Sequence, residues 1–302
     1  MKILKLGAWM MLSLSILIFT ACGGGGGGSG GTGELSMDIT DAKPLLPPDV
    51  TNLLITFEEV LVHKSGGGWL SLPLPASPYT IDLLQFYDGF TTELVPPVSL
   101  ESGKYTQIRI VISKAKIWFN DDPDSEKSVD IPSGNLKTDK NFLFDVVGGG
   151  AVDITVDFDL SQSLVVTDDG SETLACKLKP VLHIVDTFEA ATINGMIAYE
   201  SFVDGQDAVV TASVCTDNTF LSCETYTQLS VSNEAQEDDP TGFSIFWLVP
   251  NQNYRVEIDF DTSTSPVDFT EDIPVDFTED IEKNDPDIGP GDIYTLNNGS
   301  TI

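Results

Sequence analysis

The sequence is poor in positive charge and in histidine. Of its 302 residues, 15 are Lys or Arg and 47 are Asp or Glu, which gives a formal net charge of -32 at pH 7. Such a chain lacks the cationic surface that phosphate groups require, so we expect no nucleic-acid partner and no attachment to an anionic bilayer through basic patches. The two histidines, His63 and His183, lie far apart in the sequence. Most histidine-based catalytic arrangements are therefore hard to assemble.

Common catalytic motifs are also missing. The only Gly-x-Ser-x-Gly match, at 27–31, lies in a glycine tract and lacks the strand and helix that flank a nucleophile elbow, and the sequence contains no His-x-x-x-His or Cys-x-x-Cys pair. Carboxylates are the abundant reactive groups, and Asp153, Asp157 and Asp159 share one face of a predicted strand. Paired carboxylates can hydrolyse glycosides across a groove, but the same alternation is typical of a solvated outer face. We therefore expect no enzyme activity and no obligatory cofactor, with a carboxylate-dependent glycan hydrolase as the alternative.

Residues 1–21 have the layout of a secretory signal peptide. Lys2 and Lys5 precede an apolar run that ends at Phe19, shorter than the roughly 20 apolar residues of a membrane span. The ending Phe-Thr-Ala-Cys at 19–22 resembles the lipobox of bacterial lipoproteins, which implies that Cys22 carries a lipid. A plain cleavable signal and an N-terminal membrane helix remain alternatives. Removing the two lysines changes the net charge from -32 to -34, so lipid rather than charge must hold the protein at a membrane.

A glycine-rich tether follows the predicted lipidation site, so residues 22–33 comprise the lipidated cysteine and a flexible spacer. No acidic residue directly follows Cys22. In a Gram-negative cell this resembles the pattern of lipoproteins sent to the outer membrane. The sequence thus predicts a cell-envelope protein attached to that membrane through its lipid anchor.

Polar and apolar residues alternate along most of the mature chain, whereas helical periodicity is nearly absent. The alternation changes phase at Glu58-Glu59 and again near Ser113-Lys114, which predicts a β-bulge at the first and a slip at the second. Turn signals separate the runs. We expect an all-β protein of two antiparallel β-sandwich domains, immunoglobulin-like or prealbumin-like, at residues 34–187 and 188–302.

The second domain contains a perfect tandem repeat. The octapeptide PVDFTEDI occupies 266–273 and again 274–281. Two short copies cannot form a solenoid, so we expect an acidic duplicated loop at 266–281 before a closing strand that starts near Ile293.

Several segments of the first domain resemble the bacterial and archaeal family DUF4382. They include GELSMDITDA at 33–42, IDLL at 81–84, GKYTQIR at 103–109, FDV at 144–146, DFD at 157–159 and LKPV at 178–181. The resemblance implies a secreted or lipid-anchored β-sandwich and no known reaction. In the second domain, GFSI at 242–245, LVP at 248–250 and YRV at 254–256 resemble carboxypeptidase-regulatory-like, transthyretin-like modules. Those modules are generally non-catalytic appendages.

Two sets of residues are candidate structural sites. Cys215 ends one predicted strand and Cys223 begins the next, so an oxidising compartment favours a loop-closing disulfide, with free thiols or a metal pair as alternatives. Cys176 is expected to be a buried apolar residue. Calcium could bind acidic turns at two places. The candidate ligands are Asp121, Asp122 and Asp124 in one turn and Asp285, Asp287 and Asp292 in the other.

The sequence therefore predicts a lipid-anchored envelope protein that acts as a non-catalytic binding or scaffold module. Its partners would be the membrane, through the anchor, and an envelope protein or a glycan. A glycan hydrolase and a calcium-dependent, adhesin-like surface protein are the alternatives.

Overall fold

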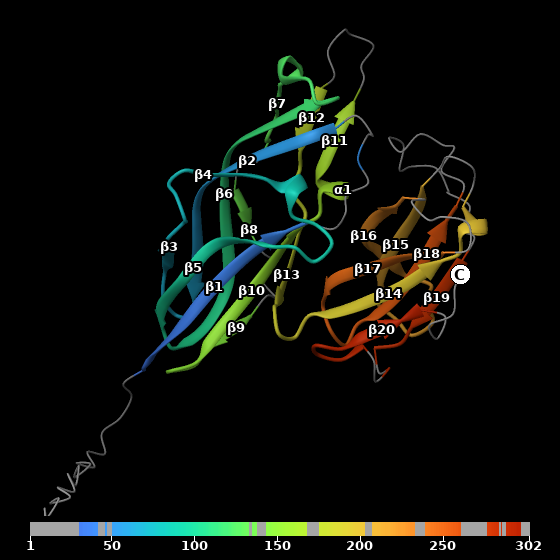
Figure 1. The fold of residues 1–302 in the computed structure, drawn as a ribbon. Helices are drawn as coiled ribbons and strands as arrows, with labels where there is room; N and C mark the ends of the chain where they lie inside the picture. The colour runs from blue at the N-terminus through green and yellow to red at the C-terminus, as the bar shows by residue number, and fades with distance from the viewer. Residues whose placement is uncertain are drawn as a thin grey trace, which may run out of the picture.

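The computed structural model describes residues 30–41, 46, 50–132, 135–137, 143–167, 175–202, 207–232, 239–260, 277–283, 285 and 288–296. These residues are mostly strand and form two β-sandwich domains, as the alternation predicts (Figure 1). Within them, no helix is both long and apolar enough to cross a bilayer.

The first domain packs two sheets face to face. One sheet has the strand order β13-β10-β1-β5. Its strands are β1 (Thr32–Thr40), β5 (Thr92–Glu101), β10 (Ala151–Phe158) and β13 (Leu182–Asp186). The side chains of Leu35, Met37 and Ile39 are fully buried, because alternate positions of β1 face the opposing sheet.

The opposing sheet is built on the long antiparallel pair of β2 (Val50–Lys64) and β6 (Gly103–Phe119). The pairing skips Glu58 on β2 and Ser113 on β6. The two predicted phase changes are therefore confirmed, and they keep the apolar side chains on the core face through both irregularities. Shorter strands pair with β2 or β6: β3 (Trp69–Leu72), β4 (Tyr79–Asp82), β7 (Lys127–Val129), β8 (Asn135–Lys137) and β9 (Phe144–Val146).

Short elements complete the first domain. A separate hairpin joins β11 (Leu164–Thr167) to β12 (Ala175–Leu178). The helical turns are η1 (Leu83–Gln85), η2 (Pro123–Ser125) and α1 (Leu160–Ser163).

The second domain has a similar two-sheet construction. One sheet has the order β17-β14-β20 and the other β16-β15-β18-β19. The elements are β14 (Ala191–Ile197), η3 (Tyr199–Ser201), β15 (Ala208–Cys215), β16 (Cys223–Val231), β17 (Thr241–Leu248), β18 (Asn253–Asp259), β19 (Phe277–Ile281) and β20 (Ile293–Thr295).

Two expectations about the strands need correction. The sheets are mixed rather than wholly antiparallel, because β1 pairs with β10 and β14 pairs with β20 in parallel. In the first domain the chain reaches β10 only after building the opposing sheet, and such a long crossover brings it back in the direction of β1. The duplicated segment at 266–281 is also not wholly loop. The last five residues of its second copy form β19, which pairs with β18.

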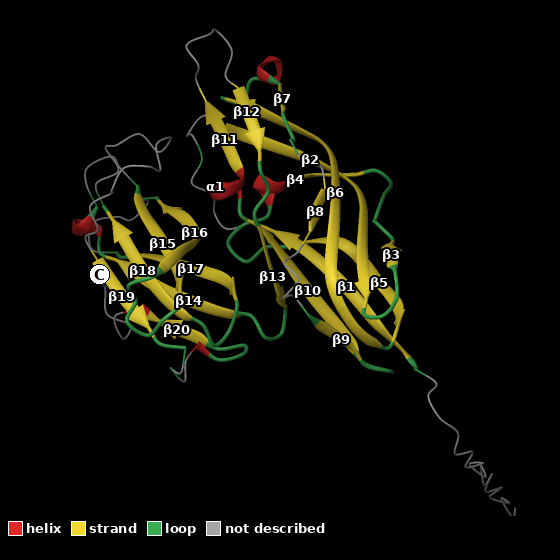
Figure 2. Cartoon of the chain, turned by 180° about the vertical axis from the view of Figure 1, so that it is seen from behind, coloured by secondary structure: helices red, strands yellow, loops and turns green. Residues whose placement is uncertain are grey.

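Each domain has its own hydrophobic core. One cluster of buried residues runs from Leu35 to Leu178 and the other from Ala191 to Leu296. The two domains lie side by side, and the chain passes from one to the other between β13 and β14 (Figure 2). This division brackets the expected boundary after residue 187.

Candidate functional site

Part of the polar face of the β13-β10-β1-β5 sheet, around Asp157, lies against the second domain. Thr155 is 0% exposed and Asp157 is 2% exposed. The expectation that the Asp153, Asp157 and Asp159 row forms a solvated outer face is therefore wrong for Asp157 and Asp159. The reason is tertiary: α1 contacts β16, and β13 contacts β17. The second domain thus covers a face whose sequence pattern is typical of a wet surface.

Buried carboxylates organise the first turn of α1 at this junction. Asp159 is fully buried and caps the helix, accepting hydrogen bonds from the Gln162 backbone N–H at 3.1 Å and from the Gln162 side-chain amide at 2.6 Å. The carboxylate of Asp41, at the end of β1, accepts the Leu160 backbone N–H at 3.0 Å. These acids satisfy amides that the helix itself cannot pair. Their first role is structural.

His183 brings an imidazole ring between the two domains. It pairs with Asp157 in the β10–β13 register, and its ring stacks on that of Tyr226 from β16 with centroids 3.8 Å apart. Its Nε2 lies 3.6 Å from Asp159 Oδ2, an ion-pair distance. The Gln162 side-chain amide donates to the Tyr226 carbonyl at 2.7 Å. Contacts through His183 and Gln162 therefore hold β16 of one domain against the other.

The surroundings of His183 shift its proton equilibrium. Burial is the largest influence and lowers the pKa of His183, but the Asp159 carboxylate, the negative charge of Asp157 and the Tyr226 backbone together outweigh it. The pKa of His183 is therefore raised above 6.5. Burial also raises the pKa of the Tyr226 hydroxyl well above 10. The junction thus favours a charged imidazolium beside carboxylates and a neutral phenol.

The junction leaves almost no room for a substrate. The space bounded by Asp41, Asp157 and Trp247 measures about 10 Å³, roughly the volume that one water needs. Gly89 closes it from the first domain, because its φ of 81° suits glycine and a Cβ there would lie 3.2 Å from the ring of Phe246. A glycan hydrolase needs two carboxylates across an open groove. Asp157 and Asp159 face the second domain instead.

An open cleft lies beside the closed junction. Its volume is about 580 Å³, within the usual range of ligand sites. Both domains contribute to its lining, which is largely apolar with three carboxylates among the apolar groups. The lining residues are Leu143, Phe144, Asp145, Val152, Ile154, Ile184, Val185, Asp186, Glu189, Val249 and Pro250. This cleft is the candidate binding site of the molecule.

Comparison with known proteins identifies the first domain. The family model described as "Domain of unknown function (DUF4382)" matches residues 32–180. Residues 32–180 are a DUF4382 domain. The resemblance seen in the sequence is thereby confirmed for this part of the chain. The transthyretin-like resemblance of the second domain stays a prediction.

Other comparisons add little to the DUF4382 match. No curated protein matches the sequence. Among solved structures, a leucine-rich repeat protein from Bacteroides thetaiotaomicron is 11% identical with a TM-score of 0.23 over 90% of this chain. The TIE protein of Bacillus anthracis is 10% identical with a TM-score of 0.19 over 88% of this chain. This chain spans only 26% and 33% of those two proteins.

A third structural match is the fimbrial anchor protein Mfa2 from Porphyromonas gingivalis. It is 8% identical with a TM-score of 0.20, and the match covers 82% of each chain. TM-scores of 0.19–0.23 do not establish a shared fold, so we infer nothing about function from these three structures.

The predicted cysteine sites have different outcomes. Cys22 lies outside the described residues. Cys215 and Cys223 are joined by a disulfide that links the end of β15 to the start of β16. Cys176, in the DUF4382 domain, is a free thiol with 5% exposure, and burial raises its pKa. It is a buried apolar residue rather than a reactive one.

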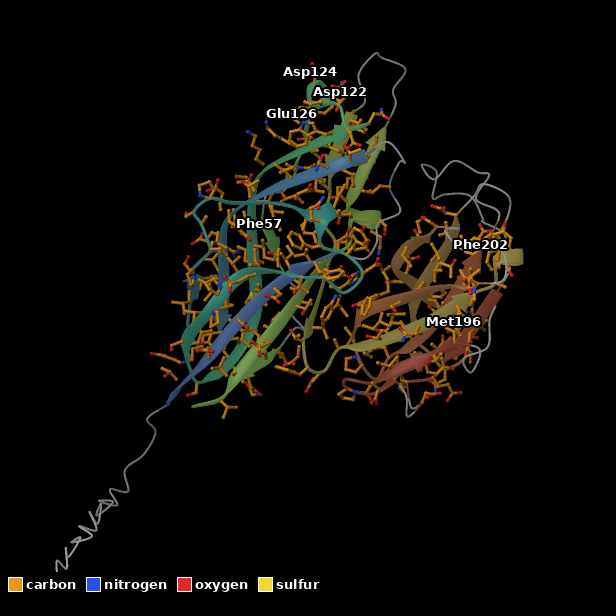
Figure 3. All side chains as sticks on the ribbon, in the orientation of Figure 1. Phe57, Asp122, Asp124, Glu126, Met196 and Phe202 are labelled. Carbon is orange, nitrogen blue, oxygen red and sulfur yellow. A yellow bond between two sulfur atoms is a disulfide. The ribbon has the colours of Figure 1, made fainter. Side chains whose placement is uncertain are left out.

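The predicted calcium turns do not gather their acids in the described residues. Figure 3 shows Asp122, Asp124 and Glu126 on one loop at the tip of the DUF4382 domain. There the Asp122 carboxylate accepts the Asp124 backbone N–H at 2.9 Å and caps η2. Across the described residues, no three His, Cys, Asp or Glu side chains form a group that could hold a metal ion. Asp287 lies outside those residues, so calcium binding at either turn stays a prediction.

Sequence reasoning missed both the junction and the cleft. His183, Tyr226 and Gln162 meet only because the two domains dock, and the cleft has contributors as distant in sequence as Leu143 and Pro250. The sequence offered one relevant signal, the alternation of polar and apolar residues. Asp157 stands at a polar position of a predicted strand and His183 stands between the apolar residues Leu182 and Ile184, but neither pattern reveals what covers these side chains.

Proposed function

We propose that this protein is a non-catalytic binding module of the bacterial cell envelope, held at a membrane by a lipid on Cys22 and binding its partner in the cleft between its domains. The cleft is the observation that carries the binding role. It has the volume of a ligand site and an apolar lining with a few polar groups, and both domains build it.

The placement of the carboxylates favours binding over hydrolysis. Asp157 and Asp159, the acids most suggestive of catalysis, are buried against the second domain. They are engaged with His183 and with the first turn of α1. A protein whose acids support its architecture, and whose open cleft is mainly apolar, is suited to recognition.

Cross-linking from the cleft in intact cells tests the binding role. A photoreactive phenylalanine analogue replaces Leu143, which lines the cleft and is 60% exposed. The matched control carries the analogue at Leu70 of β3, which is 46% exposed and does not line the cleft. We expect a discrete adduct from position 143 and none from position 70. Equal labelling from both positions, or none from position 143, would refute a partner in the cleft.

A further inference from the structure

The cleft contains an open sheet edge. β13 is the last strand of its sheet, pairing with β10 on one side, and no described strand pairs with its other side. Three of its residues, Ile184, Val185 and Asp186, line the cleft. An unpaired edge offers backbone donors and acceptors to any extended chain that reaches it.

The register shows which backbone groups face outward. The Thr187 backbone N–H donates to the Asp153 carbonyl at 2.9 Å, which makes Asp153 and Thr187 a hydrogen-bonded antiparallel pair. Hydrogen-bonded and non-bonded pairs alternate along such a ladder. Ile184 lies opposite Val156, at a non-bonded position. Its N–H and C=O therefore point away from β10, toward the cleft.

The chemistry around this edge selects for positive charge. Asp145, Asp186 and Glu189 are the three carboxylates of the largely apolar cleft lining. Asp145 is paired with Lys104 at 3.1 Å, but both side chains are more than half exposed, so the pair is weak. The whole chain carries a net charge of -32. An acidic partner would therefore be repelled, whereas a basic one would be attracted.

We infer that the cleft takes an extended, cationic polypeptide segment, which joins the first domain as an added strand on β13. Main-chain hydrogen bonds to Ile184 supply affinity. On the face that Ile184 shares with Asp186, side chains of the segment contact the apolar lining and place a basic group beside Asp186. Its further basic side chains are attracted by Glu189. This inference rests on the proposed binding role and specifies the class of partner and the manner of its recognition.

Fluorescence anisotropy with defined peptides tests the inference on the full-length protein in detergent. The probe is a labelled heptapeptide of paired valines and lysines, VVKKVVK, which presents both residue types on each face of an extended chain. One comparison peptide carries N-methyl groups on three consecutive central amides, which block strand pairing on both edges. Another has glutamate in place of lysine. We expect saturable binding of the probe, at least about tenfold weaker binding of each comparison peptide, and weakening of probe binding by salt.

Variants of the protein test the same contacts. Ile184→Pro removes an outward N–H without removing a bond to β10, a place where an edge strand tolerates proline. We expect it to weaken probe binding about tenfold or more. The double change Asp186→Asn, Glu189→Gln should have a similar effect. Its control is Glu58→Gln, Glu93→Gln, which removes the same charge from exposed positions that do not line the cleft.

The outcomes separate this inference from the proposed function. Probe binding that survives both N-methylation and Ile184→Pro overturns strand addition, while a cell adduct at position 143 would still support a partner in the cleft. Preference for the glutamate peptide, or absence of probe binding, overturns the cationic partner. Sedimentation that shows dimers lost with Ile184→Pro would assign the edge to a second copy of the chain, which also overturns the inference.

Discussion

His183 contributes to the contact between the domains through stacking and charge. Its ring stacks on Tyr226, and its Nε2 lies 3.6 Å from the fully buried Asp159. A neutral imidazole would keep the stacking but lose the attraction to the carboxylates. The protonated form is therefore the one that the junction stabilises, as the raised pKa indicates.

The stability of the protein should depend on pH through His183. Because its folded pKa is raised above the unfolded value of 6.5, the stabilising contribution is complete below about pH 6.5 and is lost as pH rises through the folded pKa. We expect the free energy of unfolding, measured in urea, to decrease across that window. His183→Gln should abolish the decrease, whereas His63→Gln should preserve it. A decrease that survives His183→Gln would contradict this assignment.

Gly195 is required by the packing of a single aromatic ring. It lies opposite Phe243 in the β14–β17 ladder, and a Cβ at position 195 would be 2.3 Å from the Phe243 ring. We expect Gly195→Ala to destabilise the protein by about 1–3 kcal/mol in thermal or urea unfolding, because the ring must move. Gly242→Ala on the neighbouring strand is the control, since its nearest contact would be at 4.0 Å. Equal losses of stability in the two variants would show that the change in chain entropy, rather than the Phe243 ring, causes the effect at position 195.

At the scale of secondary-structure elements, the sequence predicts which face of a strand each side chain occupies. It does not predict which copy of the octapeptide forms a strand. The skipped residues Glu58 and Ser113 were visible because a strand has a period of two and an inserted residue shifts every later side chain to the other face. β19 was not visible. Its octapeptide occurs twice with identical sequence, so composition and alternation cannot say which copy pairs with β18.

Ile281 should therefore matter more than its exposed neighbours in β19. It is 1% exposed and belongs to the core of the second domain, while Arg255 pairs with Asp280 beside it at 2.7 Å. Ile281→Ala should cost about 2–4 kcal/mol of unfolding free energy. Thr278→Ala, at an exposed position of the same strand, should cost much less. If Ile273→Ala, the equivalent change in the first copy, costs as much, the assignment of β19 to the second copy is wrong.

The Cys215–Cys223 disulfide should stabilise the hairpin of β15 and β16. The bridge closes a loop with a sequence separation of 8, for which the entropy model gives about 2–3 kcal/mol. We expect the double change Cys215→Ser, Cys223→Ser to lower the free energy of unfolding by about that amount. Reductant should lower wild-type stability to the same level and leave the double variant unchanged. A reductant effect on the double variant would implicate another thiol.

At the scale of the whole molecule, the two β-sandwiches could be predicted from the sequence, but the contact between the two domains could not. Alternation predicts a polar face on β10 equally well whether water or another domain covers it, which is why Asp157 was expected to be solvated. The first domain brings the polar residues Asp41 and Asp157 to the junction, so no apolar patch marks the contact on that side, although the second domain brings Phe246 and Trp247. The cleft is likewise a product of docking, since its lining comes from both domains.

At this scale the net charge also bears on the choice of binding partner. A charge of -32 argues against nucleic acid as a partner, and it is consistent with the proposal that lipid rather than charge attaches the protein to a membrane. Asp145, Asp186 and Glu189 bring part of that charge to the cleft. The same imbalance that argues against phosphate ligands thus favours a basic partner.

Membrane fractionation of a Cys22→Ser variant tests the central claim of an anchored envelope protein most directly. Wild-type protein should stay with the membranes after a high-salt wash and be released by detergent, because acyl chains rather than charges hold it. Cys22→Ser should appear in the soluble fraction, while the control Cys176→Ser should remain with the membranes. Retention of Cys22→Ser in the membrane fraction would contradict the anchor and, with it, the proposed place of the protein in the cell.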